Sequence, residues 1–111
     1  MMEIKKLRIG GLLLSSNVLM APLAGYTSYP FRLLAYKLGA GLCFTEMVSA
    51  NALKYQDRAN KLLLFTTREE PIKAVQLLGG SPAVMEEMTK SPLLEDFDLI
   101  DINMGCPVPN V

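Results

Sequence analysis

The sequence predicts an α/β fold in which parallel strands alternate with helices. Three observations support this prediction: short apolar runs recur along the chain, a helical pattern follows each of the first three, and glycine or proline marks most of the junctions. The predicted strands begin near positions 18, 42, 72 and 98, which are 24, 30 and 26 residues apart. Strand–helix units of this length are typical of parallel strands joined by helical crossovers.

The first unit is expected to begin with a strand over residues 18–21, which Pro22 ends. A helix should follow, with Thr27 or Ser28 as its cap and Pro30 in its first turn. Gly39 lies where the helix is expected to end. The apolar residues spaced as on one helical face are Phe31, Leu34, Ala35 and Leu38.

The remaining units repeat this order. We expect a second strand over residues 42–45 and a helix somewhere within residues 51–64. A third strand is expected over residues 72–78, and Ser81 should cap a helix that Pro82 opens and that runs toward Lys90. A fourth strand is expected over residues 97–102.

Two architectures fit these units: an open doubly wound sheet and a (β/α)8 barrel. The dinucleotide fingerprint G-x-G-x-x-G is absent, which weakens the doubly wound alternative. A barrel usually needs about 250 residues, so four strands are half of one. Residues 7–16, centred on Gly10-Gly11, predict a short hairpin that plugs the base of the barrel. The predicted fold is therefore the N-terminal half of a (β/α)8 TIM barrel with an N-terminal hairpin.

The composition excludes several kinds of site. The chain has no histidine, which removes Ser-His-Asp and Cys-His catalysis and most zinc sites, and we expect no metal. Cys43 and Cys106 lie far apart and predict free thiols in a reducing cytoplasm, Cys43 as part of the core. No apolar run approaches the roughly 20 residues of a membrane span. The formal net charge of +0 gives no support for nucleic-acid binding through bulk charge.

Functional residues are expected at the carboxyl ends of the strands in either architecture. The polar side chains gathered there are Glu46, Gln76, Asn103 and Cys106. Glu46 fits an active-site carboxylate and a capping or salt-bridged residue about equally well. Asp101 either points inward or pairs with a lysine of a neighbouring strand, and it is left without a role.

Four motifs at these strand ends resemble those of the tRNA-dihydrouridine synthases, a family of FMN-dependent barrel enzymes. The motifs are A-P-L-A-G at 21–25 with Y-P-F-R at 29–32, G-A-G-L-C-F-T-E-M-V-S-A at 39–50, V-Q-L-L-G at 75–79, and D-I-N-M-G-C-P-V-P at 101–109. They occur in the family's order and spacing, and the resemblance runs from about Leu7 to Val111. Leu23 stands where the family commonly has methionine, and Ser28 stands where it often has aspartate.

The resemblance implies a role for each matching residue. Pro22, Leu23 and Ala24 would line the flavin ring, Gln76 would hydrogen-bond the isoalloxazine edge, and Asn103 would face the flavin and the target uracil. Cys106 would be the general acid. In this family NADPH reduces FMN, the flavin gives hydride to C6 of a tRNA uridine, and the thiol gives a proton to C5. A thiol is mostly protonated at neutral pH, as this step requires.

The resemblance also sets limits on the chain. In the family, the flavin-phosphate site, a lysine and a histidine lie on later strands, and a helical tRNA-binding domain follows the barrel. We therefore interpret residues 1–111 as a partial FMN-binding barrel domain that binds flavin weakly or not at all by itself. Two alternatives remain: an inactive half-barrel that self-associates through its open sheet edges, and another flavin-dependent barrel oxidoreductase.

Overall fold

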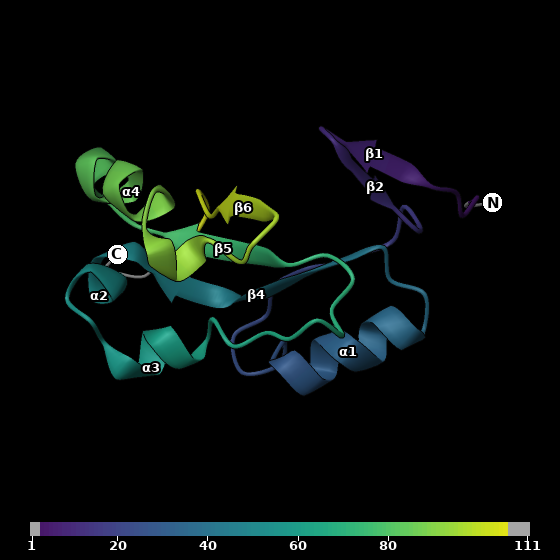
Figure 1. Ribbon diagram of the computed structural model, residues 1–111, viewed down its shortest axis with the longest axis horizontal. Helices are drawn as coiled ribbons and strands as arrows, with labels where there is room; N and C mark the ends of the chain where they lie inside the picture. The colour runs from purple at the N-terminus through teal and green to yellow at the C-terminus, as the bar shows by residue number, and fades with distance from the viewer. Residues whose placement is uncertain (1–2, 107–111) are drawn as a thin grey trace.

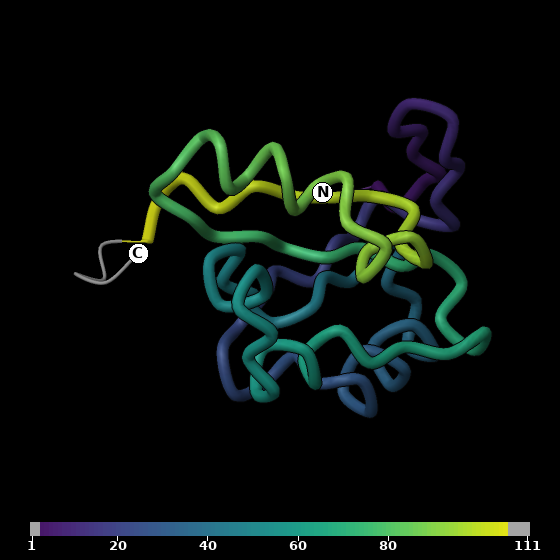
Figure 2. Tube along the Cα trace, turned by 60° about the vertical axis from the view of Figure 1, so that its left-hand side comes forward, coloured from purple at the N-terminus to yellow at the C-terminus, as the bar shows by residue number. Residues whose placement is uncertain are grey.

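A parallel four-stranded sheet lies at the centre of the structure, a computed structural model that describes residues 3–106 (Figure 1). Its strands are β3 (Leu19–Met20), β4 (Leu42–Ser49), β5 (Ala74–Leu78) and β6 (Leu99–Ile102). They pair in chain order, each parallel to the next. Figure 2 shows β6 in yellow running alongside the green trace of β5. The predicted mixed α/β fold with parallel strands is confirmed, and the strand order β3-β4-β5-β6, in which each strand pairs with the next along the chain, is the order found in one part of a (β/α)8 barrel.

The predicted hairpin is also confirmed. Strands β1 (Leu7–Ile9) and β2 (Leu12–Leu14) pair antiparallel, and Gly10 has a φ of 57° in the turn between them. Leu14 is fully buried and packs with residues at or just before the first halves of the sheet strands: Leu42, Ile72, Ala74, Phe44 and Leu99. Apolar contact therefore holds the hairpin against the amino-terminal part of the sheet.

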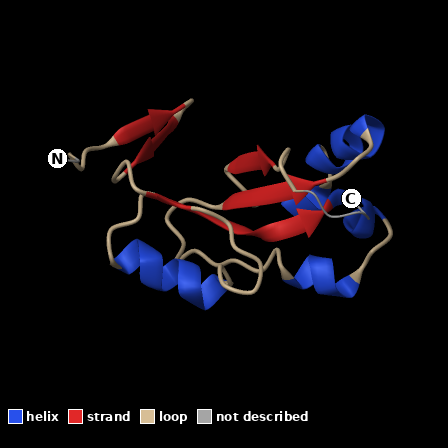
Figure 3. Ribbon diagram, turned by 180° about the vertical axis from the view of Figure 1, so that it is seen from behind, coloured by secondary structure: helices blue, strands red, loops and turns tan. Residues whose placement is uncertain are grey.

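The helices lie outside this sheet (Figure 3). They are α1 (Tyr29–Lys37), α2 (Ala50–Lys54), α3 (Arg58–Leu62) and α4 (Pro82–Thr89), with a 3-10 turn η1 (Pro92–Leu94). The helix expected within residues 51–64 is two short helices. Gln56 breaks it with a φ of 62°, and the side chains of Ser49 and Asp57 cap the two new N-termini by accepting from backbone N–H groups.

Strand β4 is longer than predicted. It continues past Thr45 to Ser49, and its register against β5 shifts between Phe44 and Met47. The fully buried Thr45 hydroxyl accepts a hydrogen bond from the N–H of Gln76 at 3.2 Å and donates to the carbonyl of Glu46 at 2.8 Å. A side chain therefore replaces the ladder partner at this irregularity.

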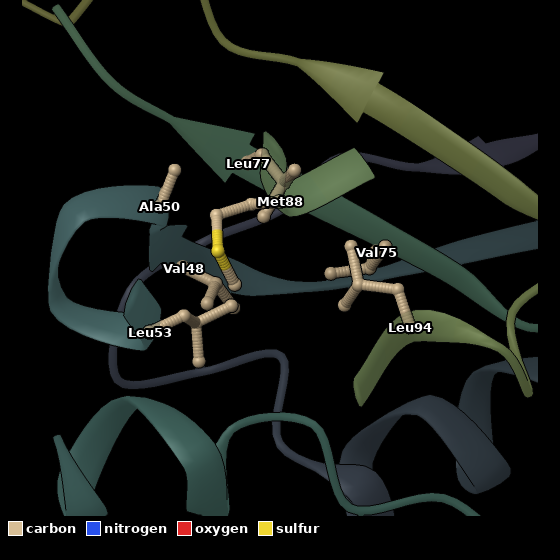
Figure 4. Close-up of a cluster of buried hydrophobic side chains, with 7 residues drawn as sticks. All are labelled: Val48, Ala50, Leu53, Val75, Leu77, Met88 and Leu94. Carbon is tan, nitrogen blue, oxygen red and sulfur yellow. The ribbon is translucent and has the colours of Figure 1, made fainter. Parts of the chain in front are cut away.

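One apolar core joins the outer face of the sheet to α2, α4 and η1 (Figure 4). Met88 of α4 points toward the sheet and lies among residues of β4, α2 and β5, while Leu94 of η1 lies beside Val75. The buried members of this core are Val48, Ala50, Leu53, Val75, Leu77, Met88 and Leu94. The outer face of the sheet is therefore a packing surface.

Helix α1 presents a different face to the sheet than the sequence predicted. Leu34 and Leu38 are 54% and 79% exposed, and Ala35 is the one member of the predicted apolar face that is buried. The buried face instead carries Arg32 and Ala35, and next to it Tyr36 donates from its hydroxyl to the carbonyl of Ile72 at 2.8 Å. These polar contacts determine the rotation of the helix, so the apolar spacing alone was misleading. Ser28 is the N-cap residue, but its side chain makes no capping hydrogen bond.

Candidate functional site

Four side chains meet at the carboxyl end of the sheet, and we call them the strand-end cluster: Met47, Gln76, Asp101 and Asn103. Gln76 lies level with Met47 on β4 and with Asp101 on β6. Its Nε2 donates to Oδ2 of Asp101 at 2.7 Å, and its Oε1 accepts from Nδ2 of Asn103 at 3.2 Å. Nδ2 of Asn103 also lies 3.4 Å from the sulfur of Met47. The predicted proximity of Gln76 and Asn103 follows from parallel strands ending together.

The segment after β6 is organised by Asn103. Its Oδ1 accepts hydrogen bonds from the backbone N–H groups of Gly105 and Cys106, each at 3.0 Å. This is a local turn of the kind that asparagine side chains form. The half-buried Cys106 is thereby attached, through its own backbone, to the strand-end cluster.

The loop after β3 lies at the same end of the sheet. The N–H of Gly25 donates to Oε1 of Glu46 on β4 at 2.6 Å, and Gly25 has a φ of 80°. Thr27 is fully buried, and its hydroxyl oxygen accepts from the N–H of Leu23 at 3.1 Å. These two contacts hold the loop in shape, and they identify Glu46 as a loop anchor.

The predicted flavin-lining residues occupy this loop. Pro22 is half-buried, whereas Leu23 and Ala24 are exposed. Their attachment to the strand-end cluster is indirect, through Glu46 on β4, because β4 also carries Met47. Their roles toward a cofactor remain predictions.

The chemistry of this end fits the ring of a flavin better than its phosphate. Backbone groups of the exposed loop and the side-chain amide of Gln76 suit the neutral, hydrogen-bonding edge of an isoalloxazine. Residues 21–25, 46–49, 76–79 and 101–106 contain no lysine or arginine. These strand ends therefore hold no side-chain cation that would bind a phosphate group.

The two cysteines occupy contrasting environments. Cys43 is fully buried against α1, and burial, with the nearby Glu70 carboxylate, raises the pKa of its thiol to about 11. The prediction that Cys43 belongs to the core is confirmed. Cys106 is part-exposed at the carboxyl end of the sheet. Accessibility therefore favours Cys106 for chemistry.

A buried ion pair between Arg32 and Glu70, which the sequence did not predict, supports the loop between β3 and α1. Nε and Nη2 of Arg32 lie 2.7 and 3.0 Å from the two carboxylate oxygens of Glu70, and both side chains are almost fully buried. Arg32 also donates to the carbonyls of Thr27 and Phe65 at 2.9 and 3.0 Å. The pair links α1, the β3–α1 loop and the segment before β5. The motif Y-P-F-R contained Arg32, but nothing near Glu70 marked it as the partner.

An open cavity of about 630 Å³ lies elsewhere, between α2 and α4. It is an open groove on the helical side, lined by residues that include Lys54, Glu87 and Leu93. Within residues 3–106, no group of three or more His, Cys, Asp or Glu side chains is placed to hold a metal ion. No helix in that range is long and apolar enough to cross a membrane.

Comparison with known proteins provides an independent test of the resemblance. A family model described as dihydrouridine synthase matches residues 19–111. A protein of Pseudomonas aeruginosa named tRNA-dihydrouridine synthase B is 38% identical over 104 residues, which cover 94% of this chain and 31% of that protein. Proteins of the same name from Salmonella typhimurium and Escherichia coli K12 are 37% identical over 105 residues, covering 95% of this chain and 33% of each. The chain thus spans about a third of the length of these curated relatives.

Proposed function

This chain belongs to the dihydrouridine synthase family, and from that membership we propose that it forms the N-terminal part of the catalytic barrel of a tRNA-dihydrouridine synthase. The proposed reaction is the FMN-dependent, NADPH-driven reduction of a uridine in tRNA to dihydrouridine. The tRNA substrate implies that the protein acts in the cytoplasm.

The observation that carries this proposal is the connection between the strand-end cluster and Cys106. Gln76 and Asn103 are hydrogen-bonded to each other, and Asn103 holds the backbone N–H of Cys106. Three of the residues that the family resemblance assigns to flavin, uracil and proton transfer, Gln76, Asn103 and Cys106, therefore form one connected unit at the carboxyl end of the strands. This is the end at which barrel enzymes carry their active sites.

Each group has a proposed part in the reaction. Bound FMN would supply, after reduction by NADPH, the hydride that no side chain provides. The loop of Pro22, Leu23 and Ala24 would hold the flavin ring, with Gln76 at the ring edge. Asn103 would face the uracil, and Cys106 would give its thiol proton to C5 as C6 receives the hydride. A uridine within a folded tRNA would have to leave its base stack to reach this site.

A chimera tests the proposal most directly. Residues 1–111 would replace the segment of the Pseudomonas aeruginosa relative to which they align, and dihydrouridine formation would be measured with NADPH and unmodified tRNA. We expect Cys106→Ala to reduce the rate by about 100-fold or more, as loss of a general acid does. Cys43→Ala, the matched cysteine substitution, should leave most of the activity.

The visible absorbance of bound flavin provides the control for this experiment, because it shows whether the chimera holds its cofactor. A chimera that binds FMN, shown by its visible spectrum, and forms no dihydrouridine would contradict the proposal. Full activity of Cys106→Ala would contradict the role of Cys106. The 111-residue chain alone should be nearly colourless, because its strand ends lack a cation for the phosphate.

Self-association is a second candidate property, favoured by the two edges of the sheet. Among the described residues, β3 and β6 each pair on one side, and Leu19 and Ile102 on these strands are 40% and 50% exposed. Unpaired edges with apolar side chains favour pairing with another chain. We expect sedimentation to show dimers or larger species of the isolated chain that Leu19→Lys or Ile102→Lys reduces. A monomer at all concentrations would exclude this candidate.

A further inference from the structure

Asp101 is the charged member of the strand-end cluster, and neither the sequence nor the proposed reaction gives it a role. It lies within β6, level with Gln76 on β5, and it is half-buried. No ion pair involves Asp101 within residues 3–106, so the lysine partner considered from the sequence is not found there. The carboxylate of Asp101 instead accepts a 2.7 Å hydrogen bond from Nε2 of Gln76.

This contact is the first in a continuous series of hydrogen bonds. Gln76 donates to Asp101, Asn103 donates to Oε1 of Gln76 at 3.2 Å, and Oδ1 of Asn103 accepts from the N–H groups of Gly105 and Cys106 at 3.0 Å. The series therefore runs from a carboxylate on β6, across to β5, and back to the turn that carries the cysteine.

The two ends of the series determine the direction of every bond within it. A carboxylate only accepts hydrogen bonds, and a backbone N–H only donates them. Asp101 therefore requires the NH2 group of Gln76, which leaves Oε1 for Asn103. The N–H groups of Gly105 and Cys106 require Oδ1 of Asn103, which leaves its NH2 for Gln76. Both requirements are met by the same pair of amide orientations.

Reversal of either amide is costly. A flipped Gln76 would place its carbonyl oxygen against the carboxylate of Asp101, and a flipped Asn103 would place its NH2 group against two N–H donors. Gln76 is buried, with 8% of its surface exposed, and Asp101 and Asn103 are half-buried, so water replaces a lost partner less readily than on an open surface. Asp101 thus selects one orientation for both amides.

We propose that Asp101 is a positioning residue for Cys106: through Gln76 and Asn103 it fixes the turn that carries the thiol. The proposal rests on the proposed function, because it takes Cys106 as the proton donor. It assigns Asp101 no contact with substrate or cofactor. Because one N–H of Gln76 is already occupied by Asp101, the proposal predicts that the second N–H of the same amide is the one that faces the cofactor.

Solvent exchange of backbone amides, measured by NMR on the 111-residue chain, tests this proposal without flavin or tRNA. Asp101→Leu removes the acceptor, and we expect the Gly105 and Cys106 amides to exchange roughly fivefold faster or more, with shifted side-chain NH2 signals of Gln76 and Asn103. Asp101→Asn retains an acceptor oxygen and should give a smaller effect.

Asp98→Asn is the matched control. The Asp98 carboxylate accepts from the N–H of Lys73 at 2.9 Å, just before β6, and has no connection to the cluster. Its substitution should leave the Gly105 and Cys106 amides unchanged. Circular dichroism would show that each variant is folded, and Asp101→Asn serves as the test if Asp101→Leu is not.

The outcomes separate this inference from the proposed function. Unchanged exchange at Gly105 and Cys106 in a folded Asp101 variant would overturn the positioning role, whatever the chimera does. A chimera without dihydrouridine synthesis would contradict the proposed function and leave the exchange result standing. Faster exchange in Asp101→Leu together with an active chimera, slowed by the same substitution, is the result that we expect.

Discussion

The inner face of the sheet is the face that points away from α2 and α4. It has two halves of different character. Its amino-terminal half is apolar: Ala74 and Leu99 pack with Leu42 against the hairpin. Two residues further along the same strands, on the same face, stand Gln76 and Asp101. The first half is closed from water by the hairpin, whereas the second is polar and hydrogen-bonded within itself. Each of these strands thus contributes apolar packing residues at its amino-terminal end and polar residues of the candidate site at its carboxyl end.

The register shift in β4 marks the boundary between the two halves. It falls between Phe44 and Met47. Phe44 packs in the apolar cluster around Leu14 of β2, which we call the hairpin cluster, and Met47 lies in the strand-end cluster. Thr45 sits between them with its hydroxyl bonded to the N–H of Gln76. The comparison therefore predicts different consequences for substitutions on either side of Thr45.

The largest effect is expected in the apolar half. Leu14→Ala removes a fully buried side chain from the hairpin cluster and should lower the free energy of unfolding by about 2 to 5 kcal/mol. The neighbouring Leu13 is 51% exposed, so Leu13→Ala, the same chemical change, should cost less than about 1 kcal/mol. Urea unfolding measures both. Equal losses would show that the hairpin is not packed as described.

The second effect concerns the outer face, where Cys43 is buried. Unfolded Cys43 loses its proton near its ordinary pKa of 9.0, and burial raises that pKa to about 11 in the folded protein. The contribution of Cys43 is therefore fully present below pH 9 and is lost as the pH rises toward 11. This loss amounts to about 2 to 3 kcal/mol.

Denaturant unfolding of the chain and of Cys43→Ala, from pH 8 to pH 11, isolates this contribution. Burial raises the pKa of the neighbouring Tyr36 hydroxyl well above its usual value, so this hydroxyl keeps its proton in the folded protein over this range and the difference between the two curves reports mainly Cys43. A difference that stays constant with pH would show that the thiol is not buried.

The sequence predicted the strands and their carboxyl ends better than it predicted the orientation of helix α1. Buried strands were found because they are continuous apolar runs, and the meeting of Gln76 with Asn103 followed from the shared edge of parallel strands. The orientation of α1 was not found, because it depends on Arg32 pairing with Glu70, 38 residues away. Local spacing carries no information about such a partner.

Irregular backbone was the other source of error. Gln56 adopts a left-handed backbone conformation and divides one expected helix into α2 and α3. A glycine at this position would have indicated such a conformation in the sequence, and a glutamine does not. The extension of β4 past Thr45 depends on a hydroxyl that replaces a ladder bond. Neither feature changes the apolar pattern from which helices and strands are predicted.

The third effect is expected at the boundary itself. Thr45→Val retains the shape of the side chain but leaves the buried N–H of Gln76 without its acceptor, which should cost about 1 to 3 kcal/mol of stability. Thr45→Ser retains the hydroxyl and should recover most of the loss. Thermal unfolding compares the two variants. A Val variant as stable as the Ser variant would show that the hydroxyl does not stabilise the register shift.

The smallest effect on stability, but a local one at the proposed cofactor loop, is expected at Glu46. Glu46→Ala removes the acceptor of the 2.6 Å bond from the N–H of Gly25, and because this contact is exposed the loss should stay below about 1 kcal/mol. The Gly25 amide should nevertheless exchange several-fold faster with solvent, measured by NMR. Glu46→Gln retains an acceptor oxygen and should stay close to the unmodified chain. Because Glu46 is joined to the loop and not to the hairpin, the Leu14 amide should be unaffected in both variants; a general increase in exchange would instead place Glu46 among the residues that hold the fold together.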